Sequence, residues 1–335
     1  MNDMISVIVP VFNGSDYVYE FWELMKKQTY ANFELIFIDD GSTDNTLEKL
    51  RTIQVEDNRI KIFTKENGGP SSARNYGMKL AIGDFITFID VDDYVCPDYI
   101  KYMYKLILEE KADIAFCSYI KMGNDEKYKK KLKKKREMRK VFNREEAIKF
   151  FSYRKYLTGY SYLKLYKREI VNNISFNENI YYGEDFLFTY DILKKCNSIV
   201  YGNQIQYIYV QYQNSSTHIK RDNTKKYQKA WEEHLKILED VRSLYPDAYK
   251  GMLGKCYILA INNTTRIYDK ERDSEFLEQL YSFIKKNAYY VASDKEAKIS
   301  NRILGMIGVL NIRFLCFVCK LLLLSNLQMI QRRTI

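Results

Sequence analysis

Four short clusters of acidic, glycine and amide residues stand out in the chain. They are Asp39–Asp44 (DDGSTD), Asn67–Asn75 (NGGPSSARN), Asp90–Asp93 (DVDD) and Gly183–Asp185 (GED). Taken alone, each cluster fits a turn or a helix cap, because Asp, Ser and Gly favour both. Acids that lie close together repel unless a cation or a ligand neutralises them. If the fold gathers the clusters, they predict one charged binding site.

The residue types in these clusters suit a reaction in which a nucleoside diphosphate is the leaving group. A hard divalent cation, held by one or two carboxylates together with phosphates, neutralises the negative charge of such a leaving group. Asp90 and Asp92 lie on the same side of an extended segment and can serve this purpose. An attacking hydroxyl must lose a proton, which a carboxylate opposite the leaving group can accept. Glu184 and Asp185 are the candidates for that carboxylate.

The elements that carry the first three clusters alternate between strands and helices. This alternation predicts βαβ units and a mostly parallel sheet, and ligands of such sheets bind at the carboxyl ends of the strands. The predicted strands are 4–11, 33–38, 59–63, 84–89 and 113–119, and the predicted helices are 15–28, 44–56, 71–82 and 97–110.

The second half of the chain is less regular. It predicts helices at 143–151 and 184–195, short strands at 198–201 and 204–212, helical hairpins over 223–290 with a break at Pro246, and one apolar helix over 299–330.

The 335 residues suffice for one large domain or two modest ones, and their net charge of +10 is concentrated in two segments. Residues 127–140 contain ten Lys or Arg and one Glu, and residues 297–335 contain six and no acid. The remainder is mildly acidic, which argues against a nucleic-acid groove and suits local contact with an anionic surface. For residues 127–140 we favour a solvated loop.

Cysteine and tyrosine usage carry little functional signal. The six cysteines form no zinc-binding pattern, and no secretory signal precedes the first strand, which favours a reducing cytoplasm. The 30 tyrosines accompany many Lys, Ile and Asn, all with A/T-rich codons. We therefore interpret them as codon bias rather than as aromatic sugar-binding platforms.

Five motifs, in this order and spacing, resemble the family-2 glycosyltransferases. The resemblance covers about the first 120 residues and extends weakly to about Tyr212. It implies a GT-A fold, an α/β class with a Rossmann-like nucleotide-binding sheet that is mixed but mostly parallel, followed by a C-terminal helical region. The motifs are VIVPVFN (7–13), IDDGSTD (38–44), NGGPSSARN (67–75), GDFITFIDVDD (83–93) and YYGEDFLF (181–188).

The resemblance also implies a domain division. Residues 1–120 would bind the nucleotide sugar and 121–220 the acceptor, both within the GT-A domain. Beyond the resemblance, the residue pattern predicts a helical region over 221–298 and an amphipathic helix that associates with a membrane over 299–335.

Site residues follow from the same resemblance. Asp185 would be the general base of an inverting transfer, and Glu184 would position the acceptor or the donor sugar. Asp92 and His218 would hold Mn²⁺ or Mg²⁺, although a lone histidine is more often structural. The nucleotide-sugar-binding residues would be Pro10, Phe12, Asn13, Asp39, Asn67, Arg74, Asp90 and Val91.

Within that donor site the implied contacts differ. Phe12 would lie against the uracil ring, and Asp39 would accept a hydrogen bond from a base NH group. Arg74 would contact the base edge or the diphosphate, and Asp90 the ribose.

The activity that the resemblance implies is metal-dependent. A hexosyl or N-acetylhexosaminyl group would move from a nucleotide diphosphate donor, by family habit a UDP-sugar, to a glycan or lipid-linked oligosaccharide in bacterial surface polysaccharide synthesis. A polyprenyl-phosphate monosaccharide synthase is an alternative, but it needs no large acceptor region. An inactive adaptor is another, which the intact acidic clusters argue against. We expect no nucleic-acid partner, and homo-oligomer formation stays open.

The C-terminal segment is apolar but carries spaced cations. At 100° per residue, Arg302, Arg313 and Lys320 fall within about 20° of one another on one helical face. Its uncharged stretch is too short to span a bilayer. We therefore expect a helix in the membrane interface and a cytoplasmic enzyme at the inner face of the cell membrane. A packed core helix or a dimer contact is the alternative.

Overall fold

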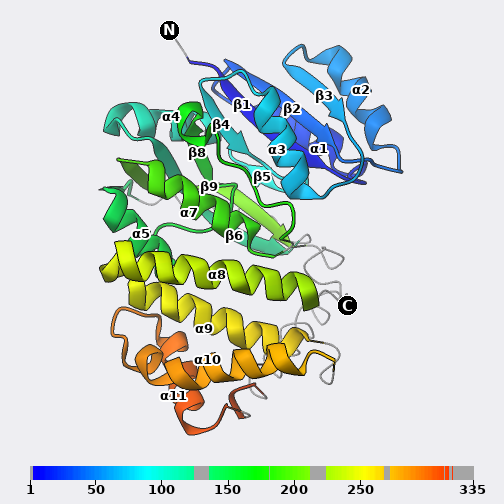
Figure 1. Cartoon of the computed structure of the whole chain (residues 1–335). Coiled ribbons are helices and arrows are strands. Elements are labelled where there is room, and N and C mark those ends of the chain that lie inside the picture. Colours follow the sequence, from blue (N-terminus) through cyan, green and yellow to red (C-terminus); the bar gives the residue numbers. More distant parts are fainter. Residues whose placement is uncertain are drawn as a thin grey trace. The chain divides into compact units, whose positions relative to one another are not determined.

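The computed structural model describes residues 3–123, 136–180, 182–211, 224–267, 272–312, 314–316 and 319. The chain forms two compact units, coloured along the sequence in Figure 1. The sheet unit comprises Met1–Ala147, Tyr156–Glu178 and Glu184–Tyr212. The helical unit comprises Ile148–Lys155, Asn179–Gly183 and Gln213–Ile335.

The sheet unit is built on a mixed sheet in the order β3-β2-β1-β4-β8-β6-β9-β5, with β7 also paired to β9. The strands from β3 to β4 are parallel, as predicted. β8 is antiparallel to both β4 and β6, and β6 is parallel to β9. The bounds are β1 Ile5–Val11, β2 Phe33–Asp39, β3 Ile60–Thr64, β4 Phe85–Phe88, β5 Tyr94–Val95, β6 Ile114–Gly123, β7 Arg139–Phe142, β8 Lys164–Lys167 and β9 Ile199–Gln211.

Helices cover both faces of this sheet because alternate residues of each strand point to opposite sides. Val7 and Val9 of β1 join a core with α1, α2 and α4. On the other face α3 lies against Ile8 and α7 against Phe88, whose ring centroid lies 6.0 Å from that of Phe188. The bounds are α1 Val18–Lys26, α2 Thr46–Glu56, α3 Pro70–Leu80, α4 Tyr99–Glu110, α5 Arg144–Ser152, α6 Arg168–Val171 and α7 Glu184–Lys195.

The structure corrects the strand prediction in the second half of the sheet. β5, β7 and β8 were not predicted, because each is too short to show an alternating pattern. The two strands predicted at 198–201 and 204–212 are one strand, β9, whose register against β6 shifts near Ser118.

The prediction of a solvated loop over 127–140 is wrong at the C-terminal end of this segment. Arg139 and Lys140 belong to β7, and Arg139 pairs with Glu109, Glu110 and Glu137. Residues 127–135 of that segment lie outside the described residues.

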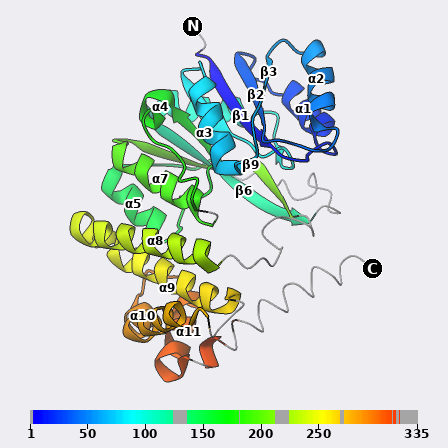
Figure 2. The same cartoon turned by 45° about the vertical axis from the view of Figure 1, so that its right-hand side comes forward.

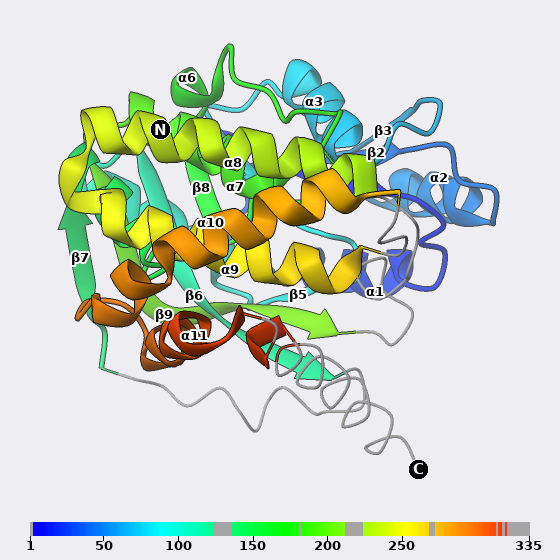
Figure 3. The same cartoon turned by 60° about the horizontal axis from the view of Figure 1, so that its bottom comes forward.

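The helical unit stacks four helices in chain order. α8 (Thr224–Leu244) packs on α9 (Tyr249–Arg266), α9 on α10 (Ser274–Ser293) and α10 on α11 (Ile299–Leu310), an order that Figure 1 shows. Figure 3 shows the same four helices from another side. The predicted break at Pro246 is confirmed by a short 3₁₀ turn, η2 (Pro246–Ala248).

The single helix predicted over 299–330 is wrong. α11 ends at Leu310 because Asn311 is extended, with φ of −158°, and its side chain accepts a hydrogen bond from the amide of Phe314 at 3.0 Å. Arg302 donates to the carbonyl of Ala292 on α10 at 3.3 Å. The predicted stripe needs one continuous helix, and α11 ends before two of its three cations, Arg313 and Lys320, which lie outside the described residues.

Gly77 sets how closely α3 approaches β1. A Cβ atom at this position would lie 2.5 Å from Cγ2 of the buried Ile8. We expect Gly77→Ala to lower the free energy of unfolding by about 1–3 kcal/mol, because overpacking outweighs the better helix propensity of Ala. Gly123→Ala is the control, since no atom lies within 4 Å of its Cβ position. Urea denaturation measures both, and equal midpoints would contradict close packing at Gly77.

Candidate active site

The loop after β1 is held by the loop after β2. The amide of Asn13, a residue with φ of 49°, donates to Ser42 Oγ at 2.9 Å, and Asn13 Oδ1 accepts from the amide of Thr43 at 2.8 Å. Pro10 is half-buried, whereas the ring of Phe12 is 52% exposed. The Asn13 side chain thus fixes the loop, and Phe12 is the residue in it that offers a surface to a ligand.

Two neighbouring carboxylates at the end of β2 differ in their contacts. Asp39 is buried, and its Oδ1 accepts from the amide of Ser42 at 3.2 Å. Asp40 is equally buried and accepts from Lys65 Nζ at 2.7 Å and from the amides of Gly68 and Gly69 at 3.0 and 2.7 Å. Asp40 therefore organises the glycine loop, a role that the sequence analysis missed.

The glycine loop lies directly against the end of β2. Asn67 Nδ2 donates to the carbonyl of Asp40 at 2.9 Å. Gly41, with φ of 76°, leaves room for this approach, since a Cβ there would meet the amide nitrogen of Asn67 at 3.0 Å. The predicted ligand-binding residue Asn67 is thus used, in this structure, to join two loops.

Arg74 links two of the acidic clusters. Its Nη2 donates to Asp90 Oδ1 at 2.8 Å, and its Nη1 lies 3.6 Å from Asp185 Oδ1. The guanidinium is also 5.6 Å from the ring centroid of Phe176 and is almost fully buried. Burial lowers the pKa of Arg74, but the charges of Asp90, Asp185 and Glu184 outweigh it and raise the pKa. The arginine therefore stays charged and joins the DVDD and GED clusters.

The DVDD segment is fixed to β9 through its last carboxylate. Asp93 is buried and accepts from Tyr207 Oη at 2.6 Å and from the amide of Val210 at 2.8 Å. Burial and the charges of Asp90 and Asp92 raise its pKa well above the usual range. Val91, predicted as a donor-binding residue, has a side chain that belongs to the buried core cluster. Asp93, which the sequence analysis did not single out, is the anchor.

Asp92 is the best-placed residue for a cation. Burial and the charge of Asp90 raise the pKa of Asp92 to about 6, so the site disfavours a second negative charge. A divalent cation would reverse that penalty. The described residues hold no group of three or more His, Cys, Asp and Glu side chains arranged to bind a metal. The donor set therefore fits a cation that takes its other ligands from phosphates and water. His218 lies outside the described residues.

Glu184 and Asp185 begin α7. Burial and the charge of Asp185 raise the pKa of Glu184 to about 8, against the opposing effect of Arg74. Asp185 Oδ1 is buried and has no hydrogen-bond donor among the described residues, although Arg74 lies within ion-pair distance. The pair thus combines a glutamic acid that favours its neutral form with an aspartate beside a permanent cation.

Lys164 on β8 is a further ionisable residue of this region. It is fully buried, donates to the carbonyl of Tyr160 and lies 4.8 Å from the ring centroid of Phe116. Burial lowers its pKa to about 7, while the charge of Asp185 opposes the shift. The sequence analysis did not single out Lys164 as a site residue, because its short strand carries no pattern that predicts the burial of a lysine.

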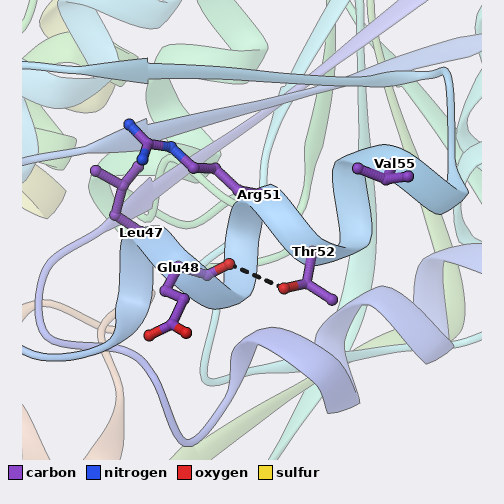
Figure 4. A pocket seen from close by; sticks show the side chains of 5 residues that line it. All are labelled: Leu47, Glu48, Arg51, Thr52 and Val55. Carbon is purple, nitrogen blue, oxygen red and sulfur yellow. Dashed lines mark hydrogen bonds between the residues drawn. The ribbon is translucent and has the colours of Figure 1, made fainter.

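A surface hollow lies elsewhere in the sheet unit. Figure 4 shows its lining, which comes from α2 alone, and the hydrogen bond from Thr52 Oγ1 to the carbonyl of Glu48 at 3.1 Å. None of its residues belongs to the acidic clusters, so we assign no ligand to it. The lining residues are Leu47, Glu48, Arg51, Thr52 and Val55.

Comparison with known sequences is consistent with this geometry. The sequence model described as Glycosyl transferase family 2 matches residues 6–175. Glycosyltransferase GlyG of Streptococcus pneumoniae is 41% identical over 120 residues, which are 36% of this chain and 40% of that protein. The uncharacterised glycosyltransferase EpsJ of Bacillus subtilis is 29% identical over 260 residues, 76% of this chain and 73% of that one. The match thus spans less than half the length of GlyG.

Solved structures share the fold. S. aureus TarS 1–349 in complex with UDP-GlcNAc has a TM-score of 0.63 and 20% identity over 91% of this chain and 87% of that chain. The mannosyltransferase PcManGT from Pyrobaculum calidifontis, in complex with GDP-Man and Mn²⁺, has a TM-score of 0.57 and 14% identity over 96% of this chain and 88% of that chain. These neighbours confirm the predicted GT-A fold.

The raised pKa of Glu184 predicts a pH-dependent stability. Between its ordinary value near 4.5 and about 8, the folded protein holds a proton that the unfolded chain has released. The free energy of unfolding therefore falls as pH rises through this window. We expect Glu184→Gln, studied without metal or nucleotide, to lose less stability than wild type between pH 5 and pH 8. Glu56→Gln, an exposed position on α2, is the control. Parallel pH profiles for wild type and Glu184→Gln would refute the proton uptake.

Proposed function

Because the chain belongs to glycosyl transferase family 2, we propose that it is an inverting glycosyltransferase. It would move a hexosyl or N-acetylhexosaminyl group from a UDP-sugar to a hydroxyl of a glycan or lipid-linked oligosaccharide in bacterial surface polysaccharide synthesis. The observation that carries this proposal is the contact of Arg74 with both Asp90 and Asp185. This contact brings three of the four sequence clusters to one edge of the sheet.

The donor nucleotide would bind at the ends of β1 and β2. The exposed ring of Phe12, on a loop fixed by Asn13 and Ser42, supports stacking against a base. Asp39 lies at the neighbouring strand end and would accept from a base NH group. The structures of TarS with UDP-GlcNAc and of PcManGT with GDP-Man are those of sugar-nucleotide complexes on the same fold.

Asp92 would hold Mn²⁺ or Mg²⁺ together with the diphosphate, and His218 stays a proposed second ligand. When bound, the cation would neutralise the charge that develops on the departing diphosphate. PcManGT contains Mn²⁺ in its donor complex. In this chain Arg74 already contacts Asp90 and Asp185. We therefore propose that its main role is to position these two carboxylates, and that any contact with the diphosphate is secondary.

The acceptor hydroxyl would transfer its proton to Asp185. Arg74 Nη1 lies 3.6 Å from Asp185 Oδ1, and this buried oxygen lacks a hydrogen-bond donor among the described residues, so a lone pair is available to accept the proton. Glu184, with its raised pKa, would be protonated near pH 7 and could donate to a sugar hydroxyl. The two neighbouring acids would therefore have different tasks, base and positioning group.

Two substitutions separate the proposed base, Asp185, from the proposed cation ligand, Asp92. We expect Asp185→Asn to lower the rate of UDP release from a panel of UDP-sugars with Mn²⁺ by about 10²-fold, the scale of losing a general base, with UDP affinity unchanged by calorimetry. Asp92→Asn should lose the Mn²⁺-dependent part of UDP release while staying folded. Asp191→Asn, an exposed position on the same helix as Asp185, is the control. A parallel loss of affinity and rate in Asp185→Asn would make Asp185 a donor-binding residue.

We also propose that α11 contacts the inner face of the cytoplasmic membrane. Its glycines Gly305 and Gly308 pack against α10 and Tyr257, whereas Ile303, Met306 and Leu310 are 49%, 48% and 85% exposed. Their spacing of three and four residues places them on one apolar face. Residues 297–335 contain six cations and no acid, which suits anionic lipid. Among the described residues, no helix is long and apolar enough to cross a membrane.

Vesicle flotation tests this contact. The wild-type protein should float with vesicles that contain anionic lipid, and Ile303→Glu with Leu310→Glu should abolish flotation, because charged residues are costly in the interface. The control is Val55→Glu, at an exposed apolar position on α2. Donor hydrolysis in solution should be unaffected. Equal flotation of all three proteins would reject α11 as the lipid contact and favour a packed structural helix.

A further inference from the structure

Six side chains gather beside the DVDD segment, at the end of the paired strands β6 and β9 that Figure 2 shows. The ring of Tyr162 stacks on three neighbours. It lies 5.0 Å from Tyr160 with an interplanar angle of 9°, 4.9 Å from Tyr207 at 14° and 5.9 Å from Tyr209 at 7°. Tyr119 and Lys121 complete the group, which we call the tyrosine stack.

The inner end of the tyrosine stack contacts the DVDD segment. Tyr162 and Tyr207 are buried. Tyr207 Oη donates to Asp93 at 2.6 Å and accepts from the amide of Asp90 at 3.4 Å. The stack therefore starts next to the residues that would hold the cation and the ribose.

The outer end of the stack faces solvent. Tyr160 and Tyr209 are half-buried, and Lys121 is exposed, with its Nζ 5.8 and 5.4 Å from their ring centroids. The aromatic rings with their hydroxyls, and the ammonium group that lies over both rings, offer the two kinds of contact that suit a pyranose ring, which has an apolar C–H face and a rim of hydroxyls. The donor base has its own aromatic residue in Phe12, at the end of β1.

Strained backbone conformations in the loop that carries Tyr160 and Tyr162 indicate that the surrounding structure holds this surface in place. The loop that carries Tyr160 and Tyr162 has non-glycine residues with positive φ at both ends, 69° at Tyr156 and 73° at Leu163. Such conformations cost energy and persist where the surrounding structure holds them, often at ligand sites. Packing of the buried Tyr162 and Tyr207 does not by itself require the outer rings of Tyr160 and Tyr209 to be ordered.

We propose that Tyr160, Tyr209 and Lys121 form an acceptor subsite that binds a pyranose ring of the glycan acceptor. This inference rests on the proposed function. The rings would stack on the sugar face, and Lys121 would donate to a sugar oxygen. From composition alone we interpreted the high tyrosine content as codon bias. Under this proposal, Tyr160 and Tyr209 among these tyrosines would bind a sugar.

Saturation-transfer NMR with methyl glycosides of glucose, galactose and N-acetylglucosamine tests the subsite. At least one glycoside should receive saturation on the C–H protons of one ring face from the wild-type protein. In Tyr160→Ala and Tyr209→Ala its affinity should fall roughly tenfold, the scale of one lost aromatic contact. Tyr160→Phe and Tyr209→Phe should retain binding, which separates loss of the ring from misfolding. Tyr289→Ala, at an exposed position on α10, is the control.

The spectra are recorded with and without UDP and Mn²⁺. Wild-type protein that transfers no saturation to any of the glycosides, or alanine variants that bind like wild type, would overturn the subsite. A protein that binds a glycoside at these tyrosines but binds no UDP by calorimetry would contradict the proposed function and leave the subsite standing. Lys121→Glu should weaken glycoside binding without changing the affinity for UDP.

Discussion

The salt bridges of Arg74 are the interaction on which the site depends. Asp90 and Asp185 come from segments far apart in the sequence, and one buried guanidinium contacts both. Without that cation their charges would repel each other in a poorly solvated region, and removing one partner of a buried pair is costly. Arg74 itself lies on α3, whose close packing on β1 through Gly77 fixes its position.

Two carboxylates that touch no proposed ligand hold the loops around this arginine. Asp40 satisfies the amides that open the glycine loop before α3, and Asp93 ties the DVDD segment to Tyr207. The hydrogen bonds of these buried acids offset the cost of burying them. The pairs Asp39–Asp40 and Asp92–Asp93 thus each divide into one residue near the proposed ligand site and one that fixes the backbone, and the tyrosine stack extends from Asp93.

Much of the sheet could be predicted because its first four strands are mostly apolar runs, two of which, β2 and β4, lead into acidic clusters. The different roles of neighbouring acids could not be predicted. Asp39 and Asp40 are adjacent residues of the same type, and only the folded glycine loop, which contacts Asp40, distinguishes them. β8 and Lys164 escaped prediction because their burial depends on strands distant in sequence. The long C-terminal helix was overpredicted because apolar periodicity gave no warning that Asn311 would leave the helix and cap the next turn.

The most direct test of the account is a crystal structure of the protein with UDP and Mn²⁺, with anomalous data collected for manganese. The account predicts a manganese peak at the carboxylate of Asp92 and the diphosphate, with Arg74 still between Asp90 and Asp185 and with the base against Phe12. A nucleotide bound away from the ends of β1 and β2, or an Arg74 side chain that has left both carboxylates, would contradict it.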